Sequence, residues 1–163
     1  LEPRAGIKWQ FSPKSSFALA YGLHSRMEKM DVYFVKTQGT GDRSVNKDLG
    51  FTKAHHVMLS YGFKISDNAN MKIEPYFQQL YNVPVIADSS YSVLNRRDFY
   101  VENVLVNQGK GRNIGVDITL ERYLYKGLYY MVTASIFDSK YYGGDRKWRN
   151  TLYNRNFIVN VLG

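Results

Sequence analysis

The feature that most constrains the fold is a strict alternation of side chains between Asn113 and Ile136. In this stretch, two runs of alternating apolar and polar residues flank a short polar turn. A period of two residues is that of a β-strand, whose successive side chains point to opposite faces of a sheet. The sequence therefore predicts two adjacent strands with an apolar face and a second face that carries Asp117, Thr119 and Glu121.

The same period recurs in other segments, where the strand formers Val, Ile, Tyr and Phe are frequent. The further strands that it predicts cover residues 5–11, 17–24, 57–65, 71–78 and 157–162. Together these segments predict an all-β fold, an antiparallel up-and-down meander of about seven strands, with no helix in the strand regions. Pro75 falls on the apolar face of its strand, and because it lacks an N–H group we expect a bulge or broken pairing there.

The connections between the predicted strands alternate in length. Tight turns have the sequences SPKSS, SDNAN and YKG, whereas the long connections cover residues 25–53, 81–112 and 139–155. Successive connections of an up-and-down sheet lie at opposite ends, so the tight turns share one end and the long loops the other. The long segments hold 15 of the 22 basic residues and 8 of the 14 acidic residues, so they carry most of the net charge of +8.

This asymmetry is typical of outer-membrane β-barrels, which have short periplasmic turns, long extracellular loops, a lipid-facing apolar surface and a polar lumen. A membrane-spanning strand needs about 9–11 residues, which the predicted strands match. Aromatic girdles mark the two membrane interfaces of such barrels. The aromatic residues that flank the tight turns here are Trp9, Phe11, Phe17, Tyr61, Phe63, Tyr123, Tyr125, Tyr129 and Tyr130.

A soluble β-sandwich is the alternative fold, because its strands also alternate. The unequal connections and the aromatic residues beside every tight turn favour part of a transmembrane barrel. In that fold, Ile118 and Val132 are expected to face lipid, whereas Asp117 and Thr133 face the lumen. The predicted strands run to both ends of the 163 residues, so we expect residues 1–163 to be a single segment cut from a longer protein.

Two loop motifs combine arginine with aromatic residues, NRRDFY at 95–100 and DRKWRN at 145–150. Guanidinium and ammonium groups bind phosphates and other anions. The motifs therefore indicate extracellular loops that meet lipopolysaccharide phosphates or an anionic ligand, with candidates Arg96, Arg97, Arg146, Lys147, Trp148 and Arg149. Such mixtures also stack on bases, so a nucleic-acid site is an alternative, as is a solvated loop without a specific ligand.

Other motifs do not indicate a metal or cofactor site. His55 and His56 are adjacent and so point to opposite faces of a strand, while His24 lies at the mouth of the first long loop. Residues 109–115, GKGRNIG, precede a strand rather than the helix that a dinucleotide-binding glycine loop needs. The chain has no cysteine, which excludes disulfides, thiolate catalysis and cysteine-based zinc sites.

The carboxylates of the polar face do not indicate an enzyme. Glu74, Asp117 and Glu121 form no pair whose separation or environment suggests general acid and base catalysis. We expect them to pair with lysines of the same face, Lys8, Lys64 or Lys72. No Ser, His and Asp arrangement is evident either, so the sequence predicts no enzyme, and it has no apolar run long enough for a membrane-spanning helix.

Several phrases of the sequence resemble one family closely. They are EPRAGIKWQF, MKIEPYFQQLYNVPV, SSYSVLN, NQGKGRNIGVDITLERYLYKGLYYMVTASIFDSKY and WRNTLYNRNFIVNVLG, which together run along nearly the whole chain. In these phrases the chain resembles the barrel portion of TonB-dependent outer-membrane receptors of the Bacteroidetes type. The resemblance implies a 22-stranded barrel with a plugged lumen, of which the predicted strands are a part.

The same resemblance implies a function for the parent protein. It would lie in the bacterial outer membrane, among lipid and lipopolysaccharide, bind a scarce nutrient at its outer face and import it when the TonB complex acts on its plug. The plug domain, the TonB box and the final aromatic-ended strand of the family do not occur in this sequence. The alternatives are a non-transporting β-protein of the cell envelope, such as an adhesin or porin-like channel, and a soluble nucleic-acid-binding β-domain.

Overall fold

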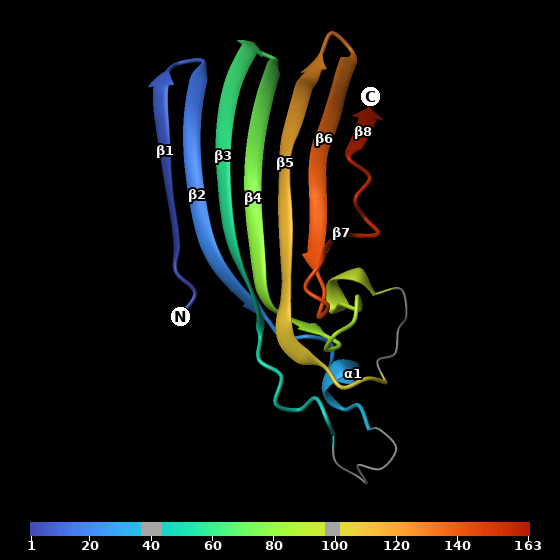
Figure 1. Ribbon diagram of the computed structural model, residues 1–163. Helices are drawn as coiled ribbons and strands as arrows, with labels where there is room; N and C mark the ends of the chain where they lie inside the picture. Colours follow the sequence, from blue (N-terminus) through green and yellow to red (C-terminus); the bar gives the residue numbers. More distant parts are fainter. Residues whose placement is uncertain (37–43, 97–101) are drawn as a thin grey trace.

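The computed structural model describes residues 1–36, 44–96 and 102–163. Its strands form one antiparallel sheet in the order β1 to β7, and β8 also pairs with β6 (Figure 1). The elements are β1 (Arg4–Ser12), β2 (Ser15–Arg26), α1 (Met30–Tyr33), β3 (Thr52–Ser66), β4 (Ala69–Val85), η1 (Val93–Asn95), β5 (Val106–Tyr125), β6 (Leu128–Tyr142), β7 (Trp148–Asn150) and β8 (Phe157–Leu162). The prediction of an all-β, up-and-down antiparallel sheet is confirmed, and the sheet is not closed.

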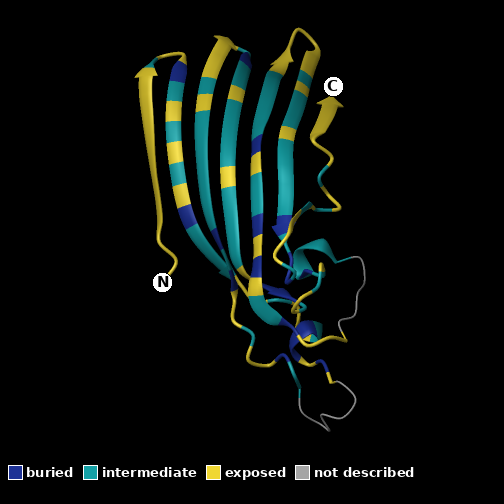
Figure 2. Cartoon of the chain, in the orientation of Figure 1, coloured by how far each residue is buried: buried dark blue, intermediate teal, exposed yellow. Residues whose placement is uncertain are grey.

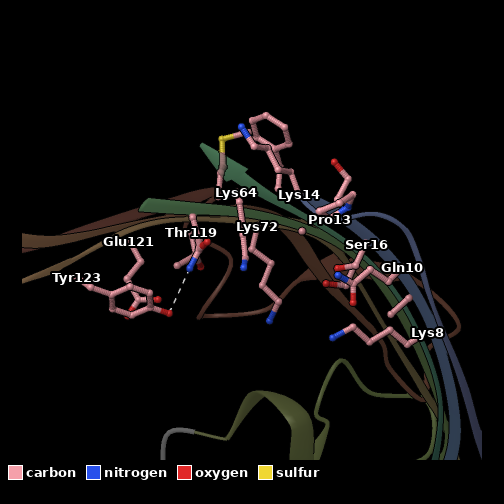
Figure 3. Close-up of a pocket in the computed structure, with 17 residues that line it drawn as sticks. Lys8, Gln10, Pro13, Lys14, Ser16, Lys64, Lys72, Thr119, Glu121 and Tyr123 are labelled. Atoms are coloured by element: carbon pink, nitrogen blue, oxygen red, sulfur yellow. Dashed lines mark hydrogen bonds between the residues drawn. The ribbon is translucent and has the colours of Figure 1, made fainter. Parts of the chain in front are cut away.

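The strand register confirms that the apolar and the polar side chains lie on opposite faces of the sheet. Ile118 pairs with Ile73 on one side and Ala134 on the other, so the apolar positions of three strands lie in one row. Thr119 pairs with Lys72 in the neighbouring row of polar positions. Figure 3 shows Lys72 and Thr119 on the inner side of the curved sheet. The polar face is therefore concave and the apolar face convex.

The pairing of β4 is interrupted at Pro75, as predicted. On the β3 side, Met58 pairs with Tyr76 and Tyr61 with Ile73, but the intervening positions of β4 have no assigned pair. The register is the same before and after the gap, so the strand contains no bulge there. On the β5 side, Pro75 pairs with Val116 without interruption. The gap on one side is what a residue without an N–H group imposes on a two-sided ladder.

Several strands continue into the predicted long connections. β4 ends at Val85, β5 begins at Val106 and β6 ends at Tyr142, so the connection between β4 and β5 covers residues 86–105. The strand β7 was not expected, and it pairs with the end of β6. Because β8 pairs with an earlier part of β6, the two short strands share one position in the sheet, and residues 151–156 leave the sheet between them.

The long connections at one end of the sheet pack against each other. Val32, Val35 and Leu105 are buried in a small hydrophobic cluster that joins residues 27–51 to residues 86–105. Asn46 is buried beside it, where its side chain donates to the carbonyl of Asn103 at 2.9 Å and accepts from the N–H of Leu105 at 2.8 Å. We call these packed connections, residues 27–36, 44–51, 86–96 and 102–105, the loop cap. In Figure 1 the loop cap lies at the end of the sheet opposite the tight turns, around α1 and η1.

The loop cap contacts the concave face of the sheet through a glycine. A Cβ atom on Gly111 would lie 2.6 Å from Cδ1 of Leu94 in η1 and 3.1 Å from Cδ1 of Leu80 in β4. Only a residue without a side chain lets Leu94 approach β5 this closely. The glycines of the GKGRNIG stretch therefore serve strand packing, and β5 continues through them without a break.

The convex face has no second layer over it among the described residues. Its apolar side chains are open to the surroundings, with Ile7, Ile136 and Val161 exposed at 69%, 62% and 74%. Figure 2 shows that β1 and β8 are exposed along nearly their whole length. Within the described ranges, no helix is long and apolar enough to cross a membrane.

Candidate functional site

Two hollows on the concave face are the candidate ligand-facing sites. The first lies near the tight turns, has a volume of about 540 Å³ and is lined by residues of β1 to β5 (Figure 3). The second lies closer to the loop cap, has a volume of about 420 Å³ and is lined by β3 to β6 and by Tyr153 from the 151–156 segment. The two hollows differ in charge and in the side chains that form them.

The hollow near the turns is basic. Four lysines line it, with Glu121 and the inward-facing ring of Tyr123: they are Lys8, Lys14, Lys64 and Lys72. Lys72 forms an ion pair with Glu74 at 2.9 Å, which confirms one of the expected pairings of the polar face. Within the described part of the chain, the other three lysines have no ion-pair partner. The hollow therefore carries an excess of positive charge that suits an anionic group.

The hollow near the loop cap is polar, aromatic and internally hydrogen-bonded. Thr151 donates to the hydroxyl of Ser139 at 3.0 Å, Ser139 donates to the side-chain oxygen of Asn113 at 2.7 Å, and Asn113 donates to that of Gln78 at 2.7 Å. This chain of bonds fixes four side chains from four segments of the fold. The exposed ring of Tyr153 also lines this hollow and adds an aromatic contact surface. Such a wall suits a polar ligand that hydrogen-bonds and stacks.

Tyr76 lies across the floor of the second hollow because its neighbour in β5 is glycine. A Cβ atom on Gly115 would lie 2.7 Å from the Tyr76 hydroxyl and 2.8 Å from the carbonyl oxygen of Ile136. Gly115 and Tyr76 are direct cross-strand partners. The glycine therefore leaves room for the ring to cover β5, an arrangement that also shields the backbone of the strand.

Replacing Gly115 with alanine is expected to lower the free energy of unfolding by about 1–3 kcal/mol, because the added methyl group overpacks this site. A second substitution, Tyr76→Ala, should recover part of the loss, since it removes one of the two clashes and leaves the one with the Ile136 carbonyl. Denaturant unfolding of the two single variants and the double variant in detergent measures the coupling. Strictly additive losses would contradict the packing of Tyr76 over Gly115.

Of the two arginines predicted to bind a ligand in the NRRDFY motif, Arg96 is described by the structure and Arg97 is not. Arg96 is largely buried and forms an ion pair with Asp31 at 2.9 Å, which ties the 86–105 connection to α1. Its guanidinium is thus part of the loop cap. Arg97 lies outside the described residues.

The other four predicted residues, 146–149, lie in the β6–β7 hairpin, where their side chains do not share one surface. Arg146 adopts a left-handed backbone conformation in the turn, and it is exposed, as is Lys147. Trp148 and Arg149 are consecutive in β7, so their side chains point to opposite faces. Arg149 donates two hydrogen bonds to the carboxylate of Asp145. The structure therefore does not bring the six candidates together, and ligand binding by them stays a prediction.

The Asp145–Arg149 pair predicts a pH dependence. The hydrogen bonds from Arg149 hold the pKa of the Asp145 carboxyl below its ordinary value. A carboxyl whose pKa is lower in the folded state stabilises that state above its unfolded pKa of about 3.9, and the stabilisation is lost as the pH falls through the folded value. Protection of the hairpin amides from hydrogen exchange should drop below about pH 4. Asp145→Asn should show no such drop, and an equal drop in both proteins would contradict this role.

Sequence reasoning missed two sets of residues. Tyr76 and Tyr153 line the second hollow, but neither belongs to a recognisable motif. A group of cations on the convex face near the loop cap was missed because the predicted strands ended too early. The signal that could have found them is the alternation of Lys110 and Arg112 with glycine, which continues the period of β5.

The histidines behave as the strand period requires. His55 forms a 2.8 Å hydrogen bond with the hydroxyl of Tyr21 on the convex face. His56 lines both the second hollow and a smaller one of about 370 Å³ beside His24, on the concave face. The prediction that His55 and His56 point to opposite faces is confirmed. Their rings therefore cannot share one ligand.

Comparison with known proteins leaves the geometry of the sheet as the main guide to function. No family model matches the chain, and no curated protein matches it. The described part of the chain forms an open, curved sheet with an apolar convex face, a polar concave face that contains several hollows, and a loop cap at one end.

Proposed function

We propose that this chain is part of the β-barrel of a TonB-dependent outer-membrane receptor of the Bacteroidetes type, which binds a scarce nutrient and imports it. The convex face contacts membrane lipid and the concave face lines the lumen. The protein is not an enzyme. Coupling to the TonB complex requires a plug domain that these 163 residues do not contain.

The observation that carries the proposal is the profile of β5 along its convex face. Four apolar positions, Ile114 to Leu120, are bracketed by Arg112 at the loop end and Arg122 at the turn end. The two arginines are ten residues apart, roughly 34 Å along a strand, or roughly 26 Å along the membrane normal at the ~40° tilt of barrel strands. That height equals the apolar band of ~25 Å that outer-membrane barrels present to lipid.

The concave face supports a route for a polar ligand. Its second hollow adjoins the loop cap, and its walls offer amide, hydroxyl and phenol groups fixed by hydrogen bonds. The basic hollow lies beyond it, toward the tight turns. In a receptor barrel, a nutrient admitted at the loop end would meet these two surfaces in that order. The identity of the nutrient would be set by loops from the rest of the barrel as well.

Single-cysteine labelling tests the lipid contact, because the chain has no cysteine of its own. We expect a fluorophore on Ile118→Cys or Val132→Cys to be quenched by brominated phosphatidylcholine in reconstituted vesicles. The same fluorophore on Thr119→Cys or Thr133→Cys, one residue away on the concave face, should be quenched much less. Equal quenching at convex and concave positions would refute the membrane assignment.

The parent gene separates a receptor from the alternatives. A receptor requires a plug domain encoded upstream of Leu1, whereas an adhesin or a porin-like channel lacks one. A soluble nucleic-acid-binding domain would stay in solution without detergent and bind with an affinity that falls steeply with salt concentration. A parent gene that encodes no plug domain upstream of Leu1 would contradict import driven by TonB.

A further inference from the structure

The convex face changes its chemistry at the loop end of the sheet. Its last apolar row on β3 to β5 joins Val57, Phe77 and Ile114. The next two rows toward the loops contain cations from β3, β5 and β6 instead of apolar side chains. These cations form a basic belt, which consists of Lys53, Lys110, Arg112 and Lys140.

Aromatic rings are interleaved with the basic belt. The Lys110 ammonium lies 5.7 Å from the centre of the Tyr142 ring, and the Arg112 guanidinium lies 5.5 Å from that of Trp148. The rings of Tyr142 and Trp148 are themselves 5.4 Å apart. On β2 to β4, His55 stacks between Tyr21 and Tyr81 at the same level. Cation–π contacts hold the cations along the sheet, and the rings form an aromatic girdle like those at membrane interfaces.

The positive charge of the belt is not neutralised within the sheet. Among the strand residues of these rows and the one below, Asp138 is the acidic residue, and it forms an ion pair with Lys140 at 3.0 Å. Its other carboxylate oxygen accepts a hydrogen bond from Asn154. Glu2 is hydrogen-bonded to Ser25, which pairs with Lys53, but the ion pair of Glu2 is with Arg4. Among the described residues, Lys53, Lys110 and Arg112 have no carboxylate partner. The belt therefore presents about three uncompensated positive charges beside the apolar face.

We propose that the basic belt binds the phosphate groups of an anionic lipid in the membrane leaflet on the loop side, a role that rests on the proposed function of the convex face. Lipid phosphates lie directly above the acyl chains, which is where the belt lies relative to the apolar rows. The belt faces away from the concave hollows, so it contacts lipid and not the transported ligand. Arginine and lysine together suit this partner, because both groups form charge-assisted bonds to phosphate oxygens.

Titration with lipid A in uncharged maltoside micelles tests the belt. The chain has two tryptophans, and Trp9→Phe leaves Trp148, inside the belt, as the fluorescent reporter. In this background, the triple substitution of Lys53, Lys110 and Arg112, the three belt cations without an ion pair among the described residues, by glutamine should weaken the apparent affinity for lipid A on the order of 100-fold. The estimate follows from a contribution of roughly fivefold for each cation near an anionic membrane surface.

Matched variants show whether lipid A binds the basic belt specifically or responds only to the net charge of the protein. The concave triple Lys8→Gln, Lys64→Gln, Lys72→Gln removes the same number of charges and should change the affinity by less than the belt triple. A charge-conserving triple, Lys53→Arg, Lys110→Arg and Arg112→Lys, should retain binding, and it controls for folding and for the environment of Trp148. Equal losses in the belt and concave triples would overturn the proposal.

Two further measurements show whether a negative result contradicts the belt proposal or the membrane assignment on which it rests. Inorganic phosphate should leave the fluorescence of Trp148 unchanged, because it is not concentrated at the apolar face; a response equal to that of lipid A would contradict a lipid partner. If Ile118→Cys and Thr119→Cys show no difference in lipid quenching, the membrane assignment itself is wrong. If that difference holds but the belt triple binds lipid A normally, only the belt proposal is wrong.

Discussion

Replacing Ile118 with arginine is expected to lower the free energy of unfolding of the bilayer-inserted protein by ~2–4 kcal/mol, the cost of a cation at the midplane of a membrane barrel. Ile118 lies close to the middle of the span from Arg112 to Arg122, and its neighbours on the convex face are Ile73 and Ala134. Neither of these two neighbours has a polar side-chain group to receive the guanidinium. Denaturant unfolding in phosphatidylcholine vesicles gives the measurement.

Thr119→Arg is the matched control, one residue further along β5. Its side chain points to the concave face, beside Lys72 and two residues from Glu121 on the same face of β5. There we expect a cost below about 1 kcal/mol, the size of a repulsion between like charges that face each other across a sheet. Equal costs for the two arginine variants would show that neither face meets lipid. A larger cost at Thr119 would reverse the assignment of the faces.

The parts of the fold that could be predicted from the sequence depend on side-chain period. Alternation from Ile114 to Glu121 fixed both faces of β5, because a shift of one residue would place every apolar side chain on the wrong face. The interrupted pairing at Pro75 could also be predicted, because the missing N–H group of a proline is a property of that residue alone. The prediction of an aromatic girdle beside the tight turns does not fit Tyr123, whose ring lines the concave hollow and not the convex face.

The parts that could not be predicted depend on contacts between distant segments. The start of β5 contains Gly109 and Gly111, which hide the alternation although Lys110 and Arg112 continue it. The loop cap depends on Val32 and Leu105, more than seventy residues apart, and no local pattern indicates their contact. The strand β7 depends on pairing with the end of β6. The basic belt is a consequence of these extensions, because it exists only where the strands continue past the predicted ends.

The isolated 163-residue chain is expected to self-associate in water, or to become ordered only in detergent. One reason is its edges: β1 and β8 are exposed along their length, and open edges of this kind pair with strands of other molecules. The other is the convex face, where Ile7, Ile136 and Val161 lie in an apolar surface with no covering layer among the described residues. A surface of this extent associates with lipid, detergent or another copy.

Sedimentation velocity with and without an uncharged detergent tests this expectation on the chain as it stands. Without detergent, we expect a broad distribution of large species, and with detergent a species of one chain. The substitution Val161→Lys adds a charge to the edge strand β8 on its convex face, and it should reduce association without abolishing it, because β1 and the rest of the convex face are unchanged. A cooperative, stable monomer in water would instead show that the apolar face is covered in solution, which would favour a soluble sandwich over a membrane barrel.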